Sequence, residues 1–508
     1  MTLEKKYLLG FDVGTYESKG VICDYSGKIL ASTAAKHVLK NPKPGFAEHD
    51  PVGDWWNDFK TVVKELLDTT GVKAEEIGCI GISAICTAIV PCDDDFNPLR
   101  PAILYAIDSR SVPQCEELNT KLPADVVKKF GGPFTVEHFG PKILWIKENE
   151  PEIFAKTKKI TFDAGWLVGK LTGNNVVDKY SVGGCLPMIN LEDISWNKEM
   201  VEMICSMDVL PEIKQSTYDI AGQVTEKAAI ETGLFAGTPV ICGTTDAGAE
   251  AVSVGVINPG DVMLMYGSTA FWVGVCSKEE EEKLGAIHYP YTIDNRGCYA
   301  GGMATTGSLT RWLLDKTARE LVADEANGGP SAYGTLFKEA EDIPVGSDGL
   351  ICLPYFMGER KPIEDPNAKG VYFGLNLMHG RGHLVHAAFE GIAYGLRQNI
   401  EHIRSQGFEV KELTAVGGGT KSPLWLQIVS DVCNIRQVVP EVIVGASYGD
   451  ALMAGLAIGA IESPEKIKEL VKVKYVVEPD PVKHEQYSKY YEIFKKLYEN
   501  NKDLMHQL

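Results

Sequence analysis

The sequence lacks any apolar run that approaches the ~20 residues of a membrane-spanning helix, and no signal-peptide pattern precedes its first expected strand. It is also poor in positive charge: 50 Lys and Arg residues stand against 69 Asp and Glu, for a formal net charge of −19. Such an acidic chain is a poor general partner for nucleic acid or an anionic membrane surface. We therefore expect a cytoplasmic protein that binds neither nucleic acid nor membrane.

Cysteine motifs are missing as well. The 12 cysteines form no Cys-x-x-Cys pair and no short Cys/His cluster, and they lie in apolar runs such as those around Cys79 and Cys242. We interpret them as buried, reduced thiols rather than as metal ligands or disulfide partners.

Two common nucleotide-binding fingerprints are absent. No segment ends in the Gly-Lys-Ser/Thr of a P-loop, and the glycine run that starts at Gly417 places Ser422 where the dinucleotide fingerprint needs its last glycine. The missing glycine argues against a nicotinamide-dependent dehydrogenase. Phosphate binding by backbone amides, helix N-termini and a metal ion stays open.

The length and the alternation of elements indicate the fold class. The chain has 508 residues, 44% of them apolar, so it can bury a large core but is too long for a single one. Buried strands alternate with amphipathic helices, which is typical of α/β layers. Near the C-terminus, residues 482–497 carry aromatic and apolar side chains at helical spacing, and we expect this helix to pack on a second domain.

Two tight strand reversals combine glycine with hydroxyl side chains. In the first, Asp12 can hold a metal-bound water, Gly14 lets the backbone approach an anion, and Thr15 adds a hydroxyl donor. The second is Tyr266-Gly267-Ser268-Thr269. One such reversal alone is best explained as a simple hairpin turn, whereas two facing each other across a cleft would clamp a triphosphate from both sides.

A third glycine-rich segment, Gly417-Gly418-Gly419, joins an expected strand at residues 413–416 to an expected helix around Trp425. Consecutive glycines let a flat ligand lie against bare backbone. A tight turn between strand and helix explains the same pattern equally well.

Asp246 stands where a buried strand and the turn Gly243-Thr244-Thr245 meet a helix of small residues. A carboxylate at this place can take a proton from a substrate hydroxyl as a general base. The alternative is a helix N-cap, for which Asp is also well suited. The position just before an expected domain boundary, and hence in a cleft, favours the catalytic interpretation.

Taken in order, these segments resemble the FGGY carbohydrate kinases, a family that includes xylulokinases, ribulokinases, gluconate kinases and glycerol kinases. The resemblance covers nearly the whole chain and rests on Gly10-Phe11-Asp12-Val13-Gly14-Thr15, Gly243-Thr244-Thr245-Asp246-Ala247, Tyr266-Gly267-Ser268-Thr269, residues 301–313, Met357-Gly358-Glu359-Arg360, residues 417–425 and Gly445-Ala446-Ser447-Tyr448-Gly449-Asp450-Ala451. The ordered set is highly specific, although each member alone is not.

The resemblance implies an α/β fold of two RNase H-like (actin-like ATPase) domains that flank a central cleft. Residues 1–250 would form the sugar-binding side with the catalytic Asp, and residues 251–508 the ATP-binding side. The cofactors implied are ATP and Mg²⁺, with Asp12 and Asp246 on the metal and Asp246 as the catalytic base. The resemblance assigns ATP binding to Asp12, Gly14, Thr15, Gly267, Ser268, Thr269, Gly307, Arg311, Gly418, Gly419 and Ser422.

The sugar side departs from the family pattern. Many xylulokinases carry a Met-His pair and glycerol kinases an Arg-Glu pair where this chain has Ile85-Cys86-Thr87. Asp108-Ser109-Arg110 does resemble the Asp-x-Arg of ketose kinases. We therefore expect Thr87, Asp108 and Asp246 to bind the substrate, with an Asp–Arg ion pair that holds a loop as the alternative role of Asp108.

These observations predict an ATP-dependent sugar kinase that phosphorylates a hydroxyl of a small sugar or polyol, most simply a ketopentose such as xylulose. Another polyol, a sugar acid or glycerol is the alternative substrate. A non-catalytic actin-like ATP-binding module is the alternative of a different class. A homodimer is expected by analogy with relatives only.

Overall fold

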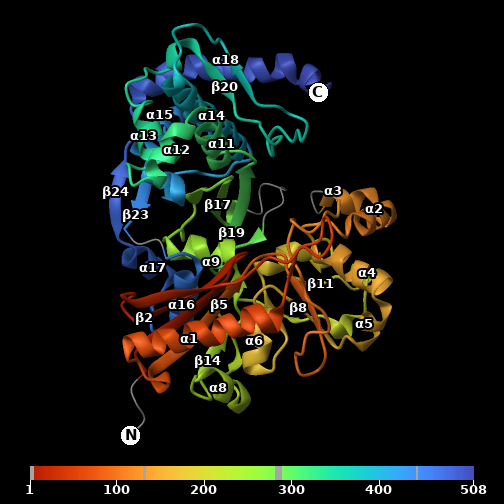
Figure 1. Ribbon diagram of the computed structural model, residues 1–508. Helices are drawn as coiled ribbons and strands as arrows, with labels where there is room; N and C mark the ends of the chain where they lie inside the picture. The colour runs from red at the N-terminus through yellow and green to blue at the C-terminus, as the bar shows by residue number, and fades with distance from the viewer. Residues whose placement is uncertain (1–4, 130–132, 281–288, 442–443) are drawn as a thin grey trace. The chain divides into compact units, whose positions relative to one another are not determined.

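The computed structural model (Figure 1) describes residues 5–129, 133–280, 289–441 and 444–508. Contacts divide the chain into two compact units, each of which is described by itself. The first unit consists of Met1–Ile257, Gly285–Gly297 and Val444–Val471, and the second of Asn258–Leu284, Cys298–Ile443 and Lys472–Leu508. The domain boundary expected between residues 250 and 251 stays a prediction. The contacts add that a segment near the C-terminus belongs with the first unit.

The first unit is built on a mixed sheet with the strand order β13-β14-β5-β1-β2-β3, in which β15 also pairs with β5. β1 pairs antiparallel with β2 and parallel with β5. These central strands are buried almost throughout because their sequences are nearly continuous apolar runs, whereas β3 alternates between half-buried and exposed residues. The strands are β1 (Tyr7–Val13), β2 (Glu17–Asp24), β3 (Ile29–Lys36), β5 (Ile77–Ala84), β13 (Ile220–Gln223), β14 (Pro239–Ile241) and β15 (Thr244–Thr245).

Three helices matter most for the candidate site of this unit: α1 (Asn57–Thr70), α9 (Asp246–Ser253) and α16 (Ala446–Ala457). α1 continues the π-helical turn Pro51–Trp56 and ends at Gly71 in the left-handed conformation. The remaining elements of the unit are β4 (Glu48–His49), β6 (Ile89–Cys92), β7 (Ala102–Ile103), α2 (Val112–Lys121), α3 (Ala124–Lys129), α4 (Phe139–Asn149), α5 (Pro151–Lys156), β8 (Lys159–Phe162), α6 (Gly165–Thr172), β9 (Val176–Asp178), β10 (Ile189–Asn190), β11 (Ser195–Trp196), α7 (Lys198–Glu202), β12 (Glu212–Lys214), α8 (Glu226–Thr232), β18 (Tyr289–Pro290) and α17 (Pro464–Leu470).

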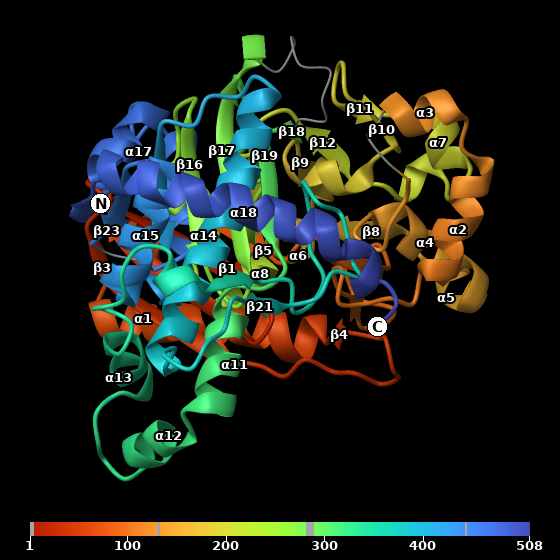
Figure 2. The ribbon, with the colours of Figure 1, turned by 90° about the horizontal axis from the view of Figure 1, so that it is seen from above.

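The second unit has its own sheet, which includes the strand order β19-β17-β16-β22-β23-β24. Two helices of 25 residues, α14 and α18, pack with α15 in this unit, and Figure 2 shows α18 running across α14 and α15. Its elements are β16 (Asp261–Tyr266), β17 (Ala270–Ser277), β19 (Arg296–Met303), α11 (Gly307–Thr317), α12 (Arg319–Ala326), α13 (Ala332–Lys338), β20 (Ile351–Leu353), β21 (Val371–Phe373), α14 (Arg381–Ser405), β22 (Glu412–Val416), α15 (Pro423–Cys433), β23 (Gln437–Pro440), β24 (Val473–Val477) and α18 (Pro481–Met505).

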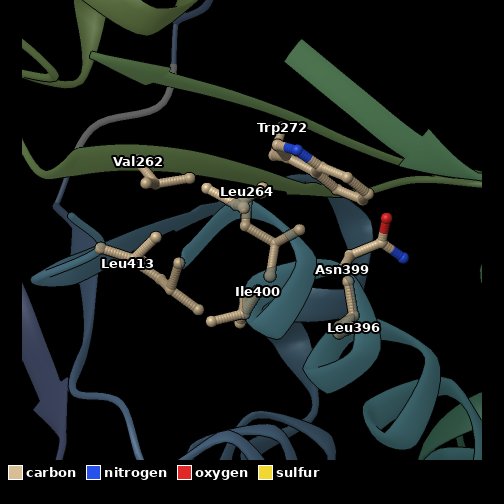
Figure 3. Close-up of a pocket in the computed structure, with 9 residues that line it drawn as sticks. Val262, Leu264, Trp272, Leu396, Asn399, Ile400 and Leu413 are labelled. Atoms are coloured by element: carbon tan, nitrogen blue, oxygen red, sulfur yellow. The ribbon is translucent and has the colours of Figure 1, made fainter. Parts of the chain in front are cut away.

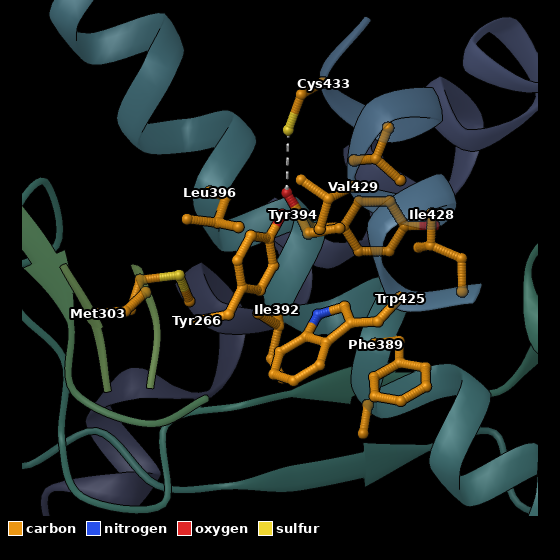
Figure 4. Packing of buried hydrophobic residues seen from close by; sticks show 14 of the residues in the cluster. Tyr266, Met303, Phe389, Ile392, Tyr394, Leu396, Trp425, Ile428, Val429 and Cys433 are labelled. Atoms are coloured by element: carbon orange, nitrogen blue, oxygen red, sulfur yellow. Dashed lines mark hydrogen bonds between the residues drawn. The ribbon is translucent and has the colours of Figure 1, made fainter. Parts of the chain in front are cut away.

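Aromatic side chains hold the core of the second unit together. The Trp425 ring stacks on Phe389 with 5.0 Å between centroids, and Tyr266 meets Trp425 edge-on at 5.3 Å (Figure 4). From α18, Tyr487, Tyr491, Phe494 and Leu497 are buried in the same core, which confirms the C-terminal helix expected from its apolar spacing.

A small cavity lies between this sheet and α14 (Figure 3). Its walls are almost wholly apolar, and its volume is about 20 Å³. The Asn399 side chain, one polar group on its lining, donates to the Gly395 carbonyl. A pocket of this kind offers a ligand no polar anchor, so we regard it as a packing defect of the core.

Candidate active site

The reversal between β1 and β2 carries the first expected phosphate motif, and a set of hydrogen bonds braces it. The Gly14 amide donates to the Glu17 carbonyl at 3.0 Å, and a Cβ on Gly14 would lie 2.8 Å from that oxygen. Glycine is therefore the residue that fits here. The Thr15 hydroxyl lies 3.0 Å from the Tyr105 hydroxyl, so this side chain is partly engaged within the unit.

Two histidine side chains contact the backbone of the same reversal. His37 Nε2 lies 3.0 Å from the Gly14 carbonyl oxygen, and His49 Nε2 lies 3.1 Å from that of Thr15. His37 is itself held by Asp58, whose Oδ2 lies 2.7 Å from Nδ1. The brace fixes the direction of the hairpin backbone. Sequence reasoning missed it because its members come from three separate segments.

Asp246 is the first residue of α9, but it does not cap that helix. The cap is Thr245, whose hydroxyl accepts from the Gly248 amide at 3.4 Å. The Asp246 carboxylate instead accepts from the adjacent Ala247 amide at 2.8 Å. The N-cap explanation of this aspartate therefore does not apply, and its side chain is left half-buried at the start of the helix.

Asp12 and Asp246 lie within electrostatic range of each other, and Glu250 from α9 joins them. Burial raises the pKa of Asp246 to about 7, and the charge of Glu250 adds to this. Burial, followed by the charge of Asp246, raises the pKa of Asp12 to about 8. Burial also raises the pKa of Glu250. The positive charge of Lys19 lowers the pKa of both Asp12 and Glu250 and so opposes the effect of burial.

Such crowded carboxylates favour a cation beside them, so the residues fit a magnesium ion that is bound mainly through phosphate oxygens and water. The described residues contain no cluster of three or more His, Cys, Asp or Glu side chains placed to hold a metal by themselves.

Asp108 is fully buried, and its carboxylate is engaged within the chain. It pairs with Arg110, whose Nη2 lies 2.7 Å away, and it accepts from the Ala47 amide at 2.6 Å. Arg110 Nη1 in turn lies 2.8 Å from Glu48 Oε1, and its guanidinium lies 4.0 Å from the centre of the Phe46 ring. This geometry favours the loop-holding ion pair over a direct sugar contact.

Thr87 is also turned inward. Its hydroxyl donates to the Glu137 carbonyl at 2.7 Å and accepts from Lys142, whose Nζ also lies 2.9 Å from the Thr87 carbonyl oxygen. Lys142 is completely buried, and this burial lowers its pKa to about 8. Cys86 and Asp163 lie within electrostatic range of the ammonium group. Sequence reasoning did not identify this contact. A lysine among the apolar residues of α4 is the feature that could have indicated it.

In the second unit, the second hairpin is joined to the start of α11. The Gly307 amide donates to the Gly267 carbonyl at 2.9 Å, and the Ser308 amide donates to the Ser268 carbonyl at 2.9 Å. A Cβ on Gly307 would lie 2.4 Å from the Gly267 oxygen, so the two segments touch. Thr269 closes the hairpin, because its carbonyl accepts from the Gly267 amide.

The glycine triplet reaches the same end of this sheet, because β22 runs parallel to β16. Gly417 has a φ of +89°, and a Cβ there would lie 2.8 Å from the Tyr266 carbonyl oxygen. A Cβ on Gly418 would meet nothing within 4 Å, so this backbone is open to a flat ligand. Ser422 is used differently, since its hydroxyl caps α15 by accepting from the Trp425 amide at 3.3 Å.

Arg311 lies one turn into α11 and is exposed. Its Nε donates to Asp315 on the same helix at 2.9 Å. The structure of the second unit thus gathers the segments of Gly267, Gly307 and Gly418, while Arg311 projects from the helix that begins beside them.

Comparison with known proteins decides the family. The model of the FGGY family of carbohydrate kinases matches in two parts, its N-terminal domain at residues 7–253 and its C-terminal domain at residues 262–458. The chain belongs to the FGGY family of carbohydrate kinases. The expected family and the expected enzyme class, a sugar phosphotransferase, are thereby confirmed.

Relatives of this carbohydrate kinase match it over nearly its whole length. A xylulose kinase of Bacillus subtilis strain 168 is 28% identical over 505 residues, 98% of each chain. A gluconokinase of the same strain is 27% identical over 474 residues, 92% of this chain and 91% of the relative.

Solved structures agree on the fold. The crystal structure of xylulose kinase from Rhodospirillum rubrum matches with a TM-score of 0.89 and 29% identity, over 99% of this chain and 100% of that one. Plasmodium falciparum glycerol kinase with ADP matches with a TM-score of 0.85 and 24% identity, over 98% and 99%, and shows the fold alone. The predicted two-domain, actin-like α/β class of this kinase is confirmed. Within the described part of the chain, none of its helices combines the length and hydropathy of a membrane span.

Proposed function

We propose that this kinase transfers the γ-phosphate of MgATP to a hydroxyl of a small neutral sugar, a ketopentose such as xylulose. The observation that carries the proposal is Asp246: it begins α9 without capping it, and burial raises its pKa to about 7. A carboxylate with this pKa is suited to accept a hydroxyl proton near neutral pH. Relatives named xylulose kinase support the choice of sugar.

In this proposal the chain positions its reactants and moves one proton. Asp246 holds the acceptor hydroxyl and takes its proton as the oxygen bonds to the γ-phosphorus, while the bond from that phosphorus to the β–γ bridging oxygen breaks and ADP leaves. The glycine segments at Gly267, Gly307 and Gly418 bind the nucleotide, because they lie together at one end of the second unit's sheet. The backbones at Gly267 and Gly307 touch each other, and a Cβ on Gly418 would meet nothing within 4 Å. Mg²⁺, when bound, neutralises phosphate charge, and Asp12 and Asp246 are the residues that would hold it through water.

The decisive experiment replaces Asp246 with Asn. We expect kcat to fall by at least ~10²-fold, because general-base catalysis contributes about 10²–10⁴-fold, while the Kd for ATP measured without Mg²⁺ stays within about threefold. Glu250→Gln, one helical turn away on α9, is the matched control and should retain turnover. Near-normal kcat in Asp246→Asn would contradict the assigned role.

The acceptor is identified by ADP release across a panel of pentuloses, hexuloses, tetritols, gluconate and glycerol. We expect turnover to be highest with a ketopentose. Preference for gluconate would favour the activity named for the Bacillus subtilis gluconokinase relative. ATP binding without turnover on any sugar would favour a non-catalytic ATP-binding module. Light scattering of the same preparation tests the proposed homodimer.

A further inference from the structure

α16 comes from the last eighth of the chain, yet it packs directly on β1 and β5 of the first unit. Two glycines allow this contact. A Cβ on Gly10 would lie 1.8 Å from the Ser447 carbonyl oxygen, and one on Gly81 would lie 2.1 Å from the Asp450 carbonyl oxygen. The helix backbone therefore touches the strands, and the Asp450 side chain reaches Ser83 of β5.

Ser83 connects the two carboxyl groups. Its Oγ lies 2.9 Å from Asp12 Oδ1 and 2.7 Å from Asp450 Oδ2. Ser83 and Asp450 are both completely buried, and Asp12 is 8% exposed. Both distances are those of real hydrogen bonds between oxygens.

The proton count limits how these three groups bond. A serine hydroxyl has one proton, so it can donate to only one of the two carboxyl groups. For the second contact to be a hydrogen bond, a carboxyl group must donate to the Ser83 oxygen. Asp450 is the better placed donor, because it is the more completely buried of the two carboxyl groups, and burial, followed by the charge of Asp12, raises its pKa well above the usual value. Ionisation of so deeply buried a carboxyl group is costly unless a cation compensates it.

We propose that Asp450 and Ser83 are positioning residues, in which a neutral Asp450 carboxyl donates to Ser83 and Ser83 donates to Asp12. These two hydrogen bonds keep Asp12 Oδ1 occupied and the Asp12 carboxylate in one orientation. The other carboxylate oxygen of Asp12 is then available to the magnesium–phosphate side of the site. This inference rests on the proposed role of Asp12 with MgATP. The inference gives Asp450 a function. The segment that contains Gly449 and Asp450 resembles a family motif, but the proposed reaction does not use it.

The test compares donors at position 450. In Asp450→Asn the amide NH₂ still donates to Ser83, whereas Asp450→Leu has the same branched arrangement of heavy atoms and no donor. We expect Asp450→Asn to keep the Kd for a non-hydrolysable ATP analogue with Mg²⁺ within about threefold of wild type. Asp450→Leu and Ser83→Ala should weaken it about tenfold or more, the size typical of lost outer-shell partners of a metal ligand. The same binding without Mg²⁺ should change little in every variant.

The two binding conditions separate positioning from damage. Equal losses with and without Mg²⁺ would mean a general structural defect and would overturn the proposal. So would wild-type affinity in Asp450→Leu, or a loss in Asp450→Asn as large as in Asp450→Leu. If Asp450→Leu does not fold, Ser83→Ala and Ser83→Thr decide: the Thr variant keeps a hydroxyl and should recover the magnesium-dependent affinity that the Ala variant loses.

Binding also distinguishes this inference from the proposed reaction. Wild-type protein that binds the analogue with Mg²⁺ but phosphorylates no sugar would refute the kinase activity and leave the Ser83–Asp450 comparison intact. Unchanged magnesium-dependent affinity in Asp12→Asn would overturn the inference, even in an active enzyme.

Discussion

Lys142 donates to Thr87 twice, to its carbonyl oxygen across 2.9 Å and to its hydroxyl oxygen. Thr87 is one of the residues predicted to bind the substrate, and a completely buried ammonium group holds its backbone in place. We expect this contact to matter on the acceptor side, because Thr87 is a predicted substrate-binding residue.

Lys142→Met should therefore act on the acceptor side. Loss of both hydrogen bonds leaves a buried carbonyl unpaired, which costs about 1–3 kcal/mol of unfolding free energy. The KM for the acceptor should rise several-fold while that for ATP stays near wild type. Lys147→Met removes a lysine of the same helix that donates to the Ile204 carbonyl at 3.0 Å, and it should leave the acceptor KM unchanged.

The same variant has a pH signature. Burial lowers the pKa of Lys142 to about 8 from 10.5, so between these values the unfolded chain binds more protons at this residue than the folded one. Its contribution to the unfolding free energy thus rises as pH rises through this window. Urea unfolding at pH values across it should show wild type gaining stability relative to Lys142→Met. A constant difference would contradict the lowered pKa.

Turnover should depend on the ionisation of Asp246. Because the base must be deprotonated and burial raises its pKa to about 7, kcat/KM for the acceptor should rise with pH and level off above about 7. Glu250→Gln removes the negative charge that contributes to this shift, so the acid limb should move to lower pH. An unmoved or upward-moved limb would show that another group controls the profile.

Asp108→Asn separates the two roles considered for this residue. If Asp108 serves the buried ion pair with Arg110, breaking the pair should cost about 3–5 kcal/mol of unfolding free energy. Arg110→Gln should cost a similar amount, and the double variant should cost less than their sum. The acceptor KM of protein that remains folded should change little. A raised acceptor KM with near-normal stability would instead indicate a sugar contact.

Gly10→Ala tests the contact between α16 and β1. The new methyl group would lie 1.8 Å from the Ser447 carbonyl oxygen, which forces helix and strand apart and should cost about 1–3 kcal/mol or more. Gly380→Ala is the control, because a Cβ there meets nothing within 4 Å. Denaturant unfolding of the two variants should differ clearly. Equal stability would argue against the close packing.

Local features of the fold could be predicted from the sequence. The β1–β2 reversal, the strand before Asp246 and the C-terminal helix follow from apolar periodicity and turn residues, which depend on neighbours in the chain. The capping residue of α9 could not be predicted from the sequence. Thr245 and Asp246 are both good caps, and only backbone geometry shows that Thr245 takes the position.

The sequence by itself determined the ordered motifs and, through them, the reaction class of this kinase, because glycine turns and the Asp246 segment are written in consecutive residues. The tertiary structure decided which groups meet. Lys142 reaches Thr87, and Ser83 joins Asp12 to Asp450, across separations that no local period encodes. These pairs form because glycines admit close backbone packing and because buried polar groups must find partners, and both conditions depend on the assembled core.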